Sequence, residues 1–119
     1  SIKSVGRMSD NINKMLEDAQ TQEILYNADE TMKNLSEITT YINEYTKDDK
    51  LKEDITTTVT NLANITENIS KIMNDYNKLE DSDKMKLKNT VKDVLTITRN
   101  VKKFSEKLNK RFLLFRLMF

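Results

Sequence analysis

The last turns of the chain carry the residue types best suited to bind another molecule, here an apolar surface bordered by cations. Four apolar residues recur at helical spacing, and we expect them to face lipid or a partner: Leu108, Phe112, Phe115 and Phe119. Lys110, Arg111 and Arg116 are the only charges from residue 110 onward, placed to contact headgroups or an acidic partner. Exposed apolar patches of this kind mark interaction sites, and bordering cations suit a membrane interface. Docking on the chain's own helices or lining an oligomer are the alternatives.

Catalytic and metal-binding chemistry is poorly represented. The chain has no Cys and no Trp, and its His count is zero, which removes thiol and imidazole nucleophiles, His or Cys metal sites and disulfides. The segment from Asp81 resembles a calcium loop only superficially, because its twelfth position is Lys92 and its sixth is not glycine. We therefore expect no enzyme, no cofactor and no metal.

The elements that position the C-terminal segment are predicted to be long helices. Residues 51–79 show the clearest pattern, with a seam in steps of four and three that only Thr58 interrupts: Leu51, Ile55, Leu62, Ile65, Ile69, Ile72, Tyr76 and Leu79. This spacing places all of these side chains along one narrow stripe of an α-helix, as in a coiled coil or slender bundle.

Similar stripes flank this seam and predict an all-α fold. It would contain three or four long amphipathic helices over about 3–20, 23–46, 50–79 and 84–118, in a coiled-coil-like or elongated bundle within one helical region. Breaks are expected near 20–23, where Thr21 could cap a new helix, near 46–50, where Asp48 or Asp49 could cap, and near 80–84. With no proline and one glycine, a folded bundle and a continuous rod both stay open.

A short pattern recurs three times, once in each later stripe. TMKNLSEITTYI (31–42), TVTNLANITENI (58–69) and TVKDVLTITRNV (90–101) align without gaps on a shared Ile-Thr pair. Such repeats normally indicate one structural unit used several times. The alternative is that amphipathic helices of the same composition look alike.

Charge is divided unevenly along the chain. Residues 1–83 hold nine Lys and Arg against seventeen Asp and Glu, a net charge of −8, whereas residues 84–119 carry a net charge of +9. The basic end could meet an acidic partner or an anionic lipid surface, or the two halves could pair within the protein. No recognition motif accompanies the lysines, so we expect no nucleic acid partner. No apolar run is long enough to span a bilayer.

The ending Leu108-Asn109-Lys110-Arg111-Phe112, followed by Phe115-Arg116-Leu117-Met118-Phe119, resembles the C-terminal helical region of mammalian cell entry (MCE) proteins. These are the MlaD-like substrate-binding components of bacterial lipid transporters. The resemblance implies a homo-oligomer, a hexamer in that family, that handles phospholipid alongside the membrane subunits of an ABC transporter in the bacterial cell envelope. We expect the chain to be part of a longer protein, since the family's anchor and barrel are not in it.

Two functions follow from these observations. The first is a non-enzymatic, self-associating helical module of a lipid-transport protein that presents an apolar surface to lipid. The second is a coiled-coil scaffold or adaptor, whose basic, aromatic C-terminal helix docks a partner or a membrane surface.

Overall fold

The computed structural model describes the backbone of residues 2–118 and the side chains of residues 14–118. Three α-helices make up nearly all of it: α1 (Ile2–Tyr41), α2 (Asp49–Asn74) and α3 (Asp81–Met118). A π-helical turn, η1 (Ile42–Thr46), ends α1, and a 3₁₀ turn, η2 (Tyr76–Lys78), follows α2. No strand occurs in residues 2–118, and the prediction of an all-α fold is confirmed.

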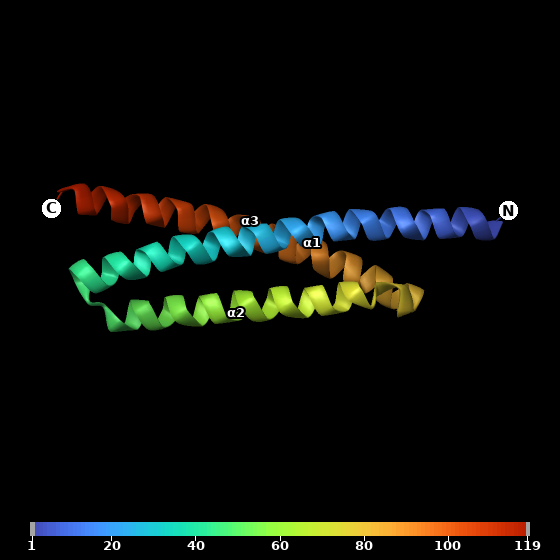
Figure 1. The fold of residues 1–119 in the computed structure, drawn as a ribbon, viewed down its shortest axis with the longest axis horizontal. Coiled ribbons are helices and arrows are strands. Elements are labelled where there is room, and N and C mark those ends of the chain that lie inside the picture. The colour runs from blue at the N-terminus through green and yellow to red at the C-terminus, as the bar shows by residue number, and fades with distance from the viewer. Residues whose placement is uncertain (1, 119) are drawn as a thin grey trace.

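The helices fold back on one another as an elongated up-down-up bundle. α1 and α3 run in the same direction, and α2 runs in the opposite direction beside α1 (Figure 1). The bundle measures 69 × 21 × 16 Å. The N-terminal end of α1 projects beyond the α2–α3 turn, whereas the C-terminal end of α3 lies about level with the α1–α2 turn (Figure 1). Of the two arrangements that the sequence leaves open, the chain adopts the bundle.

The turn between α1 and α2 forms without glycine or proline. Lys47 takes a left-handed conformation (φ 52°, ψ 35°), and its backbone N–H donates to the Ile42 carbonyl oxygen at 2.6 Å. Asp48 then caps α2, since its side chain accepts a hydrogen bond from the Leu51 N–H at 3.1 Å. The expected break near 46–50 is therefore present, and Asp48 is its cap.

The expected break near 20–23 was wrong, because α1 is continuous from Ile2 to Tyr41. Thr21 does not cap a new helix. Its hydroxyl donates to the carbonyl oxygen of Glu17 at 2.8 Å, one helical turn earlier, and its side chain is buried. With no glycine or proline there, nothing stops the helix.

The break after α2 comes earlier than expected. α2 ends at Asn74, and α3 begins at Asp81 rather than near residue 84. The 3₁₀ turn directs Tyr76 inward, and its side chain is buried among residues of all three helices. Leu79 packs against this cluster. Both seam residues thus reach the core from the turn, outside the α2 helix itself.

Six of the eight residues of the predicted 51–79 seam are buried or half-buried, and the other two need correction. Leu51 is half-buried and Ile55, Leu62, Ile69 and Tyr76 are buried, but Ile65 and Ile72 are 40% and 43% exposed. The core instead receives the row one residue later: Val59, Thr66 and Met73. On a helix, each of these three residues lies as close to the buried positions Ile55, Leu62 and Ile69 as the predicted residue before it does, so either row can complete the stripe. Because α2 packs mainly on α1, only the flank that turns toward the other helices is covered.

The apolar core is divided into two clusters along the bundle. The first lies near the α2–α3 turn and contains Ile24, Ile69, Met73, Tyr76, Leu87, Val91 and Leu95. The second lies near the α1–α2 turn and contains Leu35, Ile38, Ile42 and Ile55, with Leu51, Val59, Leu108 and Phe112 packed against it. Burial of these side chains supplies the main driving force for folding.

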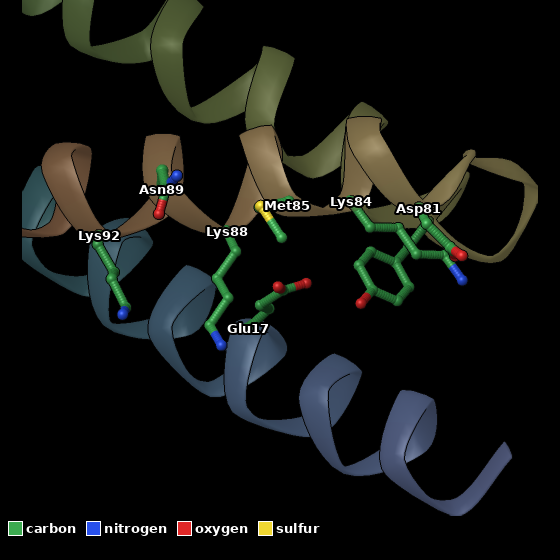
Figure 2. Close-up of a pocket in the computed structure, with 8 residues that line it drawn as sticks. Glu17, Asp81, Lys84, Met85, Lys88, Asn89 and Lys92 are labelled. Carbon is green, nitrogen blue, oxygen red and sulfur yellow. The ribbon is translucent and has the colours of Figure 1, made fainter. Parts of the chain in front are cut away.

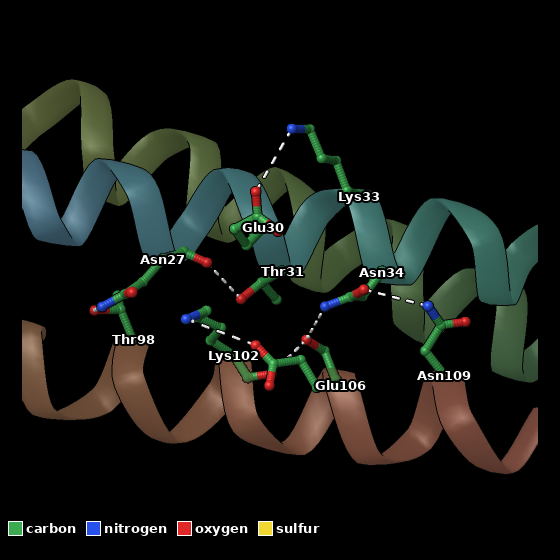
Figure 3. Close-up of polar contacts among 10 residues, drawn as sticks. Asn27, Glu30, Thr31, Lys33, Asn34, Thr98, Lys102, Glu106 and Asn109 are labelled. Atoms are coloured by element: carbon green, nitrogen blue, oxygen red, sulfur yellow. Dashed lines mark hydrogen bonds and ion pairs between the residues drawn. The ribbon is translucent and has the colours of Figure 1, made fainter.

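Polar contacts join α1 and α3 between the two clusters (Figure 3). The Asn27 amide donates to the Thr98 hydroxyl at 3.5 Å, and the Asn34 amide donates to the Ser105 hydroxyl at 3.2 Å. Both pairs join residues 71 positions apart, as expected for parallel helices held in one register. Asn109 donates to Asn34 as well. Buried polar pairs of this kind specify register, because a shift would leave them unsatisfied.

The acidic first half and the basic last half of the chain also meet along this interface. Arg99 donates two hydrogen bonds to the Glu23 carboxylate, at 2.7 and 2.9 Å. This contact lowers the pKa of Glu23 below its ordinary value. Lys102 lies over the Tyr26 ring, 5.1 Å from its centroid. Pairing of the two halves within the protein therefore accounts for part of the charge asymmetry.

Candidate functional site

The C-terminal segment of α3 begins inside the bundle. Leu108 and Phe112 are half-buried against the second core cluster, and the Phe112 ring stacks on Tyr41 with the centroids 6.4 Å apart. The structure therefore places these two residues, expected at a lipid- or partner-facing surface, partly against the chain's own helices. Their burial follows from the α3 stripe, which stays against α1 as far as Phe112.

Beyond Phe112 the apolar side chains of the segment become exposed. Phe115 is 42% exposed, and Leu114, Leu117 and Met118 are more so, at 62%, 75% and 81%. Phe119 lies outside the described residues. An apolar pocket of about 270 Å³ opens at the start of this surface, lined by Thr46, Leu108, Arg111, Phe112 and Phe115. We call the exposed side chains of Leu113, Leu114, Phe115, Leu117 and Met118 the C-terminal apolar surface.

The three cations of the segment lie around this surface in different ways. Lys110 and Arg111 are exposed, and Arg111 borders the apolar pocket. Arg116 reaches back to α1, where its guanidinium lies 5.7 Å from the centroid of the Tyr41 ring. The arrangement offers an apolar surface with cations at its edge, which is suited to binding an amphiphile by burial and charge.

A second site, which the sequence did not point to, lies at the opposite end of the bundle. A pocket of about 410 Å³ opens between α1 and the start of α3, lined by Glu17, Tyr76, Asp81, Lys84, Met85, Lys88, Asn89 and Lys92. Glu17 extends from α1 toward α3, and Lys88 and Lys92 extend from successive turns of α3 toward α1 (Figure 2). The sequence feature that could have indicated this pocket is the spacing of its three lysines, which lie four residues apart on one helix.

Glu17 is the unusual group in this pocket. Its side chain is only 2% exposed, and its Oε2 atom has no hydrogen-bond partner. Burial raises the pKa of the Glu17 carboxyl above its ordinary value, and a hydrogen bond from Tyr76 and the charge of Lys88 oppose that shift in part. A buried acceptor without a donor costs stability.

Replacing Glu17 by glutamine is therefore expected to stabilise the protein at neutral pH. A raised pKa means that the folded state binds the proton more tightly, so the wild type loses stability as the pH rises above 4.5, the ordinary value of this carboxyl. The gain should be on the order of 1 kcal/mol at pH 7 and should shrink toward pH 4.5. Thermal unfolding across this pH range measures it.

The neighbouring substitution Asp18→Asn is the control, since it removes the same charge from an exposed position. It should leave the stability nearly unchanged. A Glu17→Gln variant less stable than the wild type at pH 7 would contradict the assignment of Glu17 as an unsatisfied carboxylate.

Comparison with known proteins assigns neither site. No protein-family model, curated protein or solved structure matches the chain. Within residues 2–118, no helix is both long and apolar enough to cross a bilayer. The described side chains include no group of three or more acidic, His or Cys residues placed to hold a metal ion.

Proposed function

We propose that this chain is a non-enzymatic helical module of a lipid-transport protein, which self-associates and offers its C-terminal apolar surface to phospholipid. The observation that carries the proposal is the clustered exposure of Leu114, Phe115, Leu117 and Met118 at the end of a helix whose inner face is packed as far as Phe112. Burying such side chains contributes about 25 cal/mol for each Å² removed from water. Acyl chains provide that burial without shape-specific contacts.

The bordering cations support a phospholipid over a neutral apolar ligand. Lys110 and Arg111 lie within one helical turn of the apolar pocket, so a phosphate can contact them while the acyl chains cover the surface. Self-association would cover more of the same surface. By its resemblance to MCE proteins, we further propose a hexamer that works with the membrane subunits of an ABC transporter in the bacterial cell envelope.

A double substitution tests the proposal directly. Leu114→Ser with Leu117→Ser removes two exposed apolar side chains, and we expect co-purified phospholipid per chain to fall at least about fivefold, in line with the loss of two hydrophobic contacts. Because both residues are exposed, the thermal unfolding midpoint should stay within a few degrees of the wild type. Phospholipid is measured by extraction and mass spectrometry.

The matched control is Ile72→Ser with Ile97→Ser, which removes two apolar side chains, 43% and 56% exposed, far from the C-terminal surface. Lipid retention in this control should equal that of the wild type. Equal loss in both variants, or no loss in either, would overturn the proposal.

The second candidate function is a coiled-coil scaffold or adaptor, and the bundle itself favours it. The polar pairs between α1 and α3 hold a defined register without any partner, as a rigid adaptor requires. In that case the C-terminal double substitution would abolish binding to a protein partner, and the purified chain would carry no phospholipid in any variant.

A further inference from the structure

We propose that the pocket between α1 and the start of α3 binds a small molecule carrying a primary ammonium group and a phosphomonoester, of the phosphoethanolamine type. The site is distinct from the C-terminal apolar surface and lies at the other end of the bundle. It does not depend on the proposed function.

The ammonium group is inferred from Glu17. The Oε2 atom of this buried side chain lacks a donor, and the side chain lines the pocket. A primary ammonium donates a charge-assisted hydrogen bond to such a carboxylate. A simple anion would leave Oε2 unsatisfied and would repel it. Glu17 therefore selects a ligand with an N–H donor.

The phosphate is inferred from the lysines on α3. Lys84, Lys88 and Lys92 line the pocket on three successive turns, and Glu17 and Asp81 are the acidic side chains among its described lining residues. Lys88 and Lys92 would repel a free cation, whereas a phosphomonoester of a primary amine carries a small net negative charge near neutral pH. Such a molecule matches both walls of the pocket at once.

The positions of the charges set the orientation. Glu17 approaches from α1, and Lys88 and Lys92 approach from α3 on the side away from Asp81 (Figure 2). The ammonium would lie toward Glu17 and the phosphate toward Lys88 and Lys92. Both ends of the ligand are then bound by opposite charges within one cavity of about 410 Å³.

Titration of the folded protein followed by two-dimensional NMR tests the inference with four probes. O-phosphoethanolamine should give saturable shifts centred on residues around the pocket. Phosphocholine carries the same charges but no N–H donor, and we expect it to bind about tenfold more weakly, as the loss of one charge-assisted hydrogen bond implies. Inorganic phosphate and ethanolamine should each bind more weakly than the combined molecule. Inorganic phosphate that binds as well as phosphoethanolamine would overturn the inference.

Variants assign the binding to the named groups. Glu17→Gln should weaken phosphoethanolamine binding about tenfold and leave phosphocholine binding unchanged, while Lys88→Gln should weaken both. Lys86→Gln, an exposed lysine outside the pocket, is the control and should have little effect. An unaffected affinity in Glu17→Gln, or no saturable binding at millimolar concentrations, contradicts the proposal.

A last comparison separates a free metabolite from a lipid headgroup. Vesicles of phosphatidylcholine with phosphatidylethanolamine are compared with vesicles of phosphatidylcholine alone. Because the headgroup phosphodiester carries less negative charge than a phosphomonoester, we expect no preference for the first composition that depends on Glu17. A preference that Glu17→Gln abolishes would overturn the assignment to a phosphomonoester and give the pocket to the lipid headgroup.

Discussion

Ile69→Ala is expected to lower the free energy of unfolding by about 2–4 kcal/mol, whereas Ile72→Ala lowers it by less than about 1 kcal/mol. The two isoleucines lie three residues apart on α2 and lose the same atoms. Ile69 is 5% exposed within the first core cluster, and Ile72 is 43% exposed. Removal of the buried side chain leaves a cavity, while the exposed position loses little.

Urea unfolding followed by circular dichroism gives both values, and Met73→Ala adds a second test of the corrected seam. Met73 is buried one residue after Ile72, so its replacement should cost about as much as that of Ile69. Equal costs at Ile69 and Ile72, with a small cost at Met73, would show that the seam predicted from the sequence is the packed one.

The second expected result separates two phenylalanines on the same helix. Phe112→Ser should lower the free energy of unfolding by about 2 kcal/mol, because the ring packs on the second core cluster and stacks on Tyr41. Phe115→Ser should cost less than about 1 kcal/mol, since its side chain is 42% exposed. In lipid retention the order should reverse, when each variant is compared at a temperature where it is fully folded.

Denaturant unfolding and lipid extraction on the same preparations measure both effects. Tyr41→Phe serves as a control, because it keeps the aromatic stack and removes only the hydroxyl. A Phe112→Ser variant as stable as the wild type would mean that α3 does not dock on α1 at this end.

The α3 helix was the element most predictable from sequence. Its stripe from Leu87 to Phe112 is buried or half-buried at every position that the spacing indicates. The spacing predicted these positions correctly because α3 packs along α1 over most of its length, so one face of α3 is covered throughout. The all-α fold followed for the same reason, since these stripes have no strand periodicity.

The α1 seam was predicted only in part, because several of its members are polar. The apolar spacing correctly indicates Ala28, Leu35, Ile38 and Ile42, which are buried. Most buried positions of α1 and of the π-helical turn that ends it follow steps of four and three: Glu17, Thr21, Ile24, Ala28, Thr31, Leu35, Ile38 and Ile42, with Asn27 and Tyr41 buried beside this row. A search for apolar residues selects Leu25 and Met32 instead, which are half-buried. Thr21 and Thr31 can be buried because each hydroxyl donates to a carbonyl oxygen one turn earlier. Hydropathy alone does not show that these buried hydroxyls have hydrogen-bond partners.

The repeated Ile-Thr pattern did not predict equivalent environments. The isoleucine of the pair is fully buried at Ile38, but it is 40% exposed at Ile65 and 56% exposed at Ile97. Each helix packs against different neighbours, so the same position of the pattern faces the core in one helix and solvent in another. The Glu17 pocket was missed for a related reason, because its walls come from segments about sixty residues apart in the sequence.

Native mass spectrometry of the gently purified chain tests the central claim most directly, since it reads stoichiometry and bound lipid together. The proposed lipid-module function predicts a higher oligomer that carries phospholipid, and the resemblance to MCE proteins predicts a hexamer. A lipid-free monomer or dimer would contradict the lipid-module function and leave the scaffold as the better explanation of the bundle.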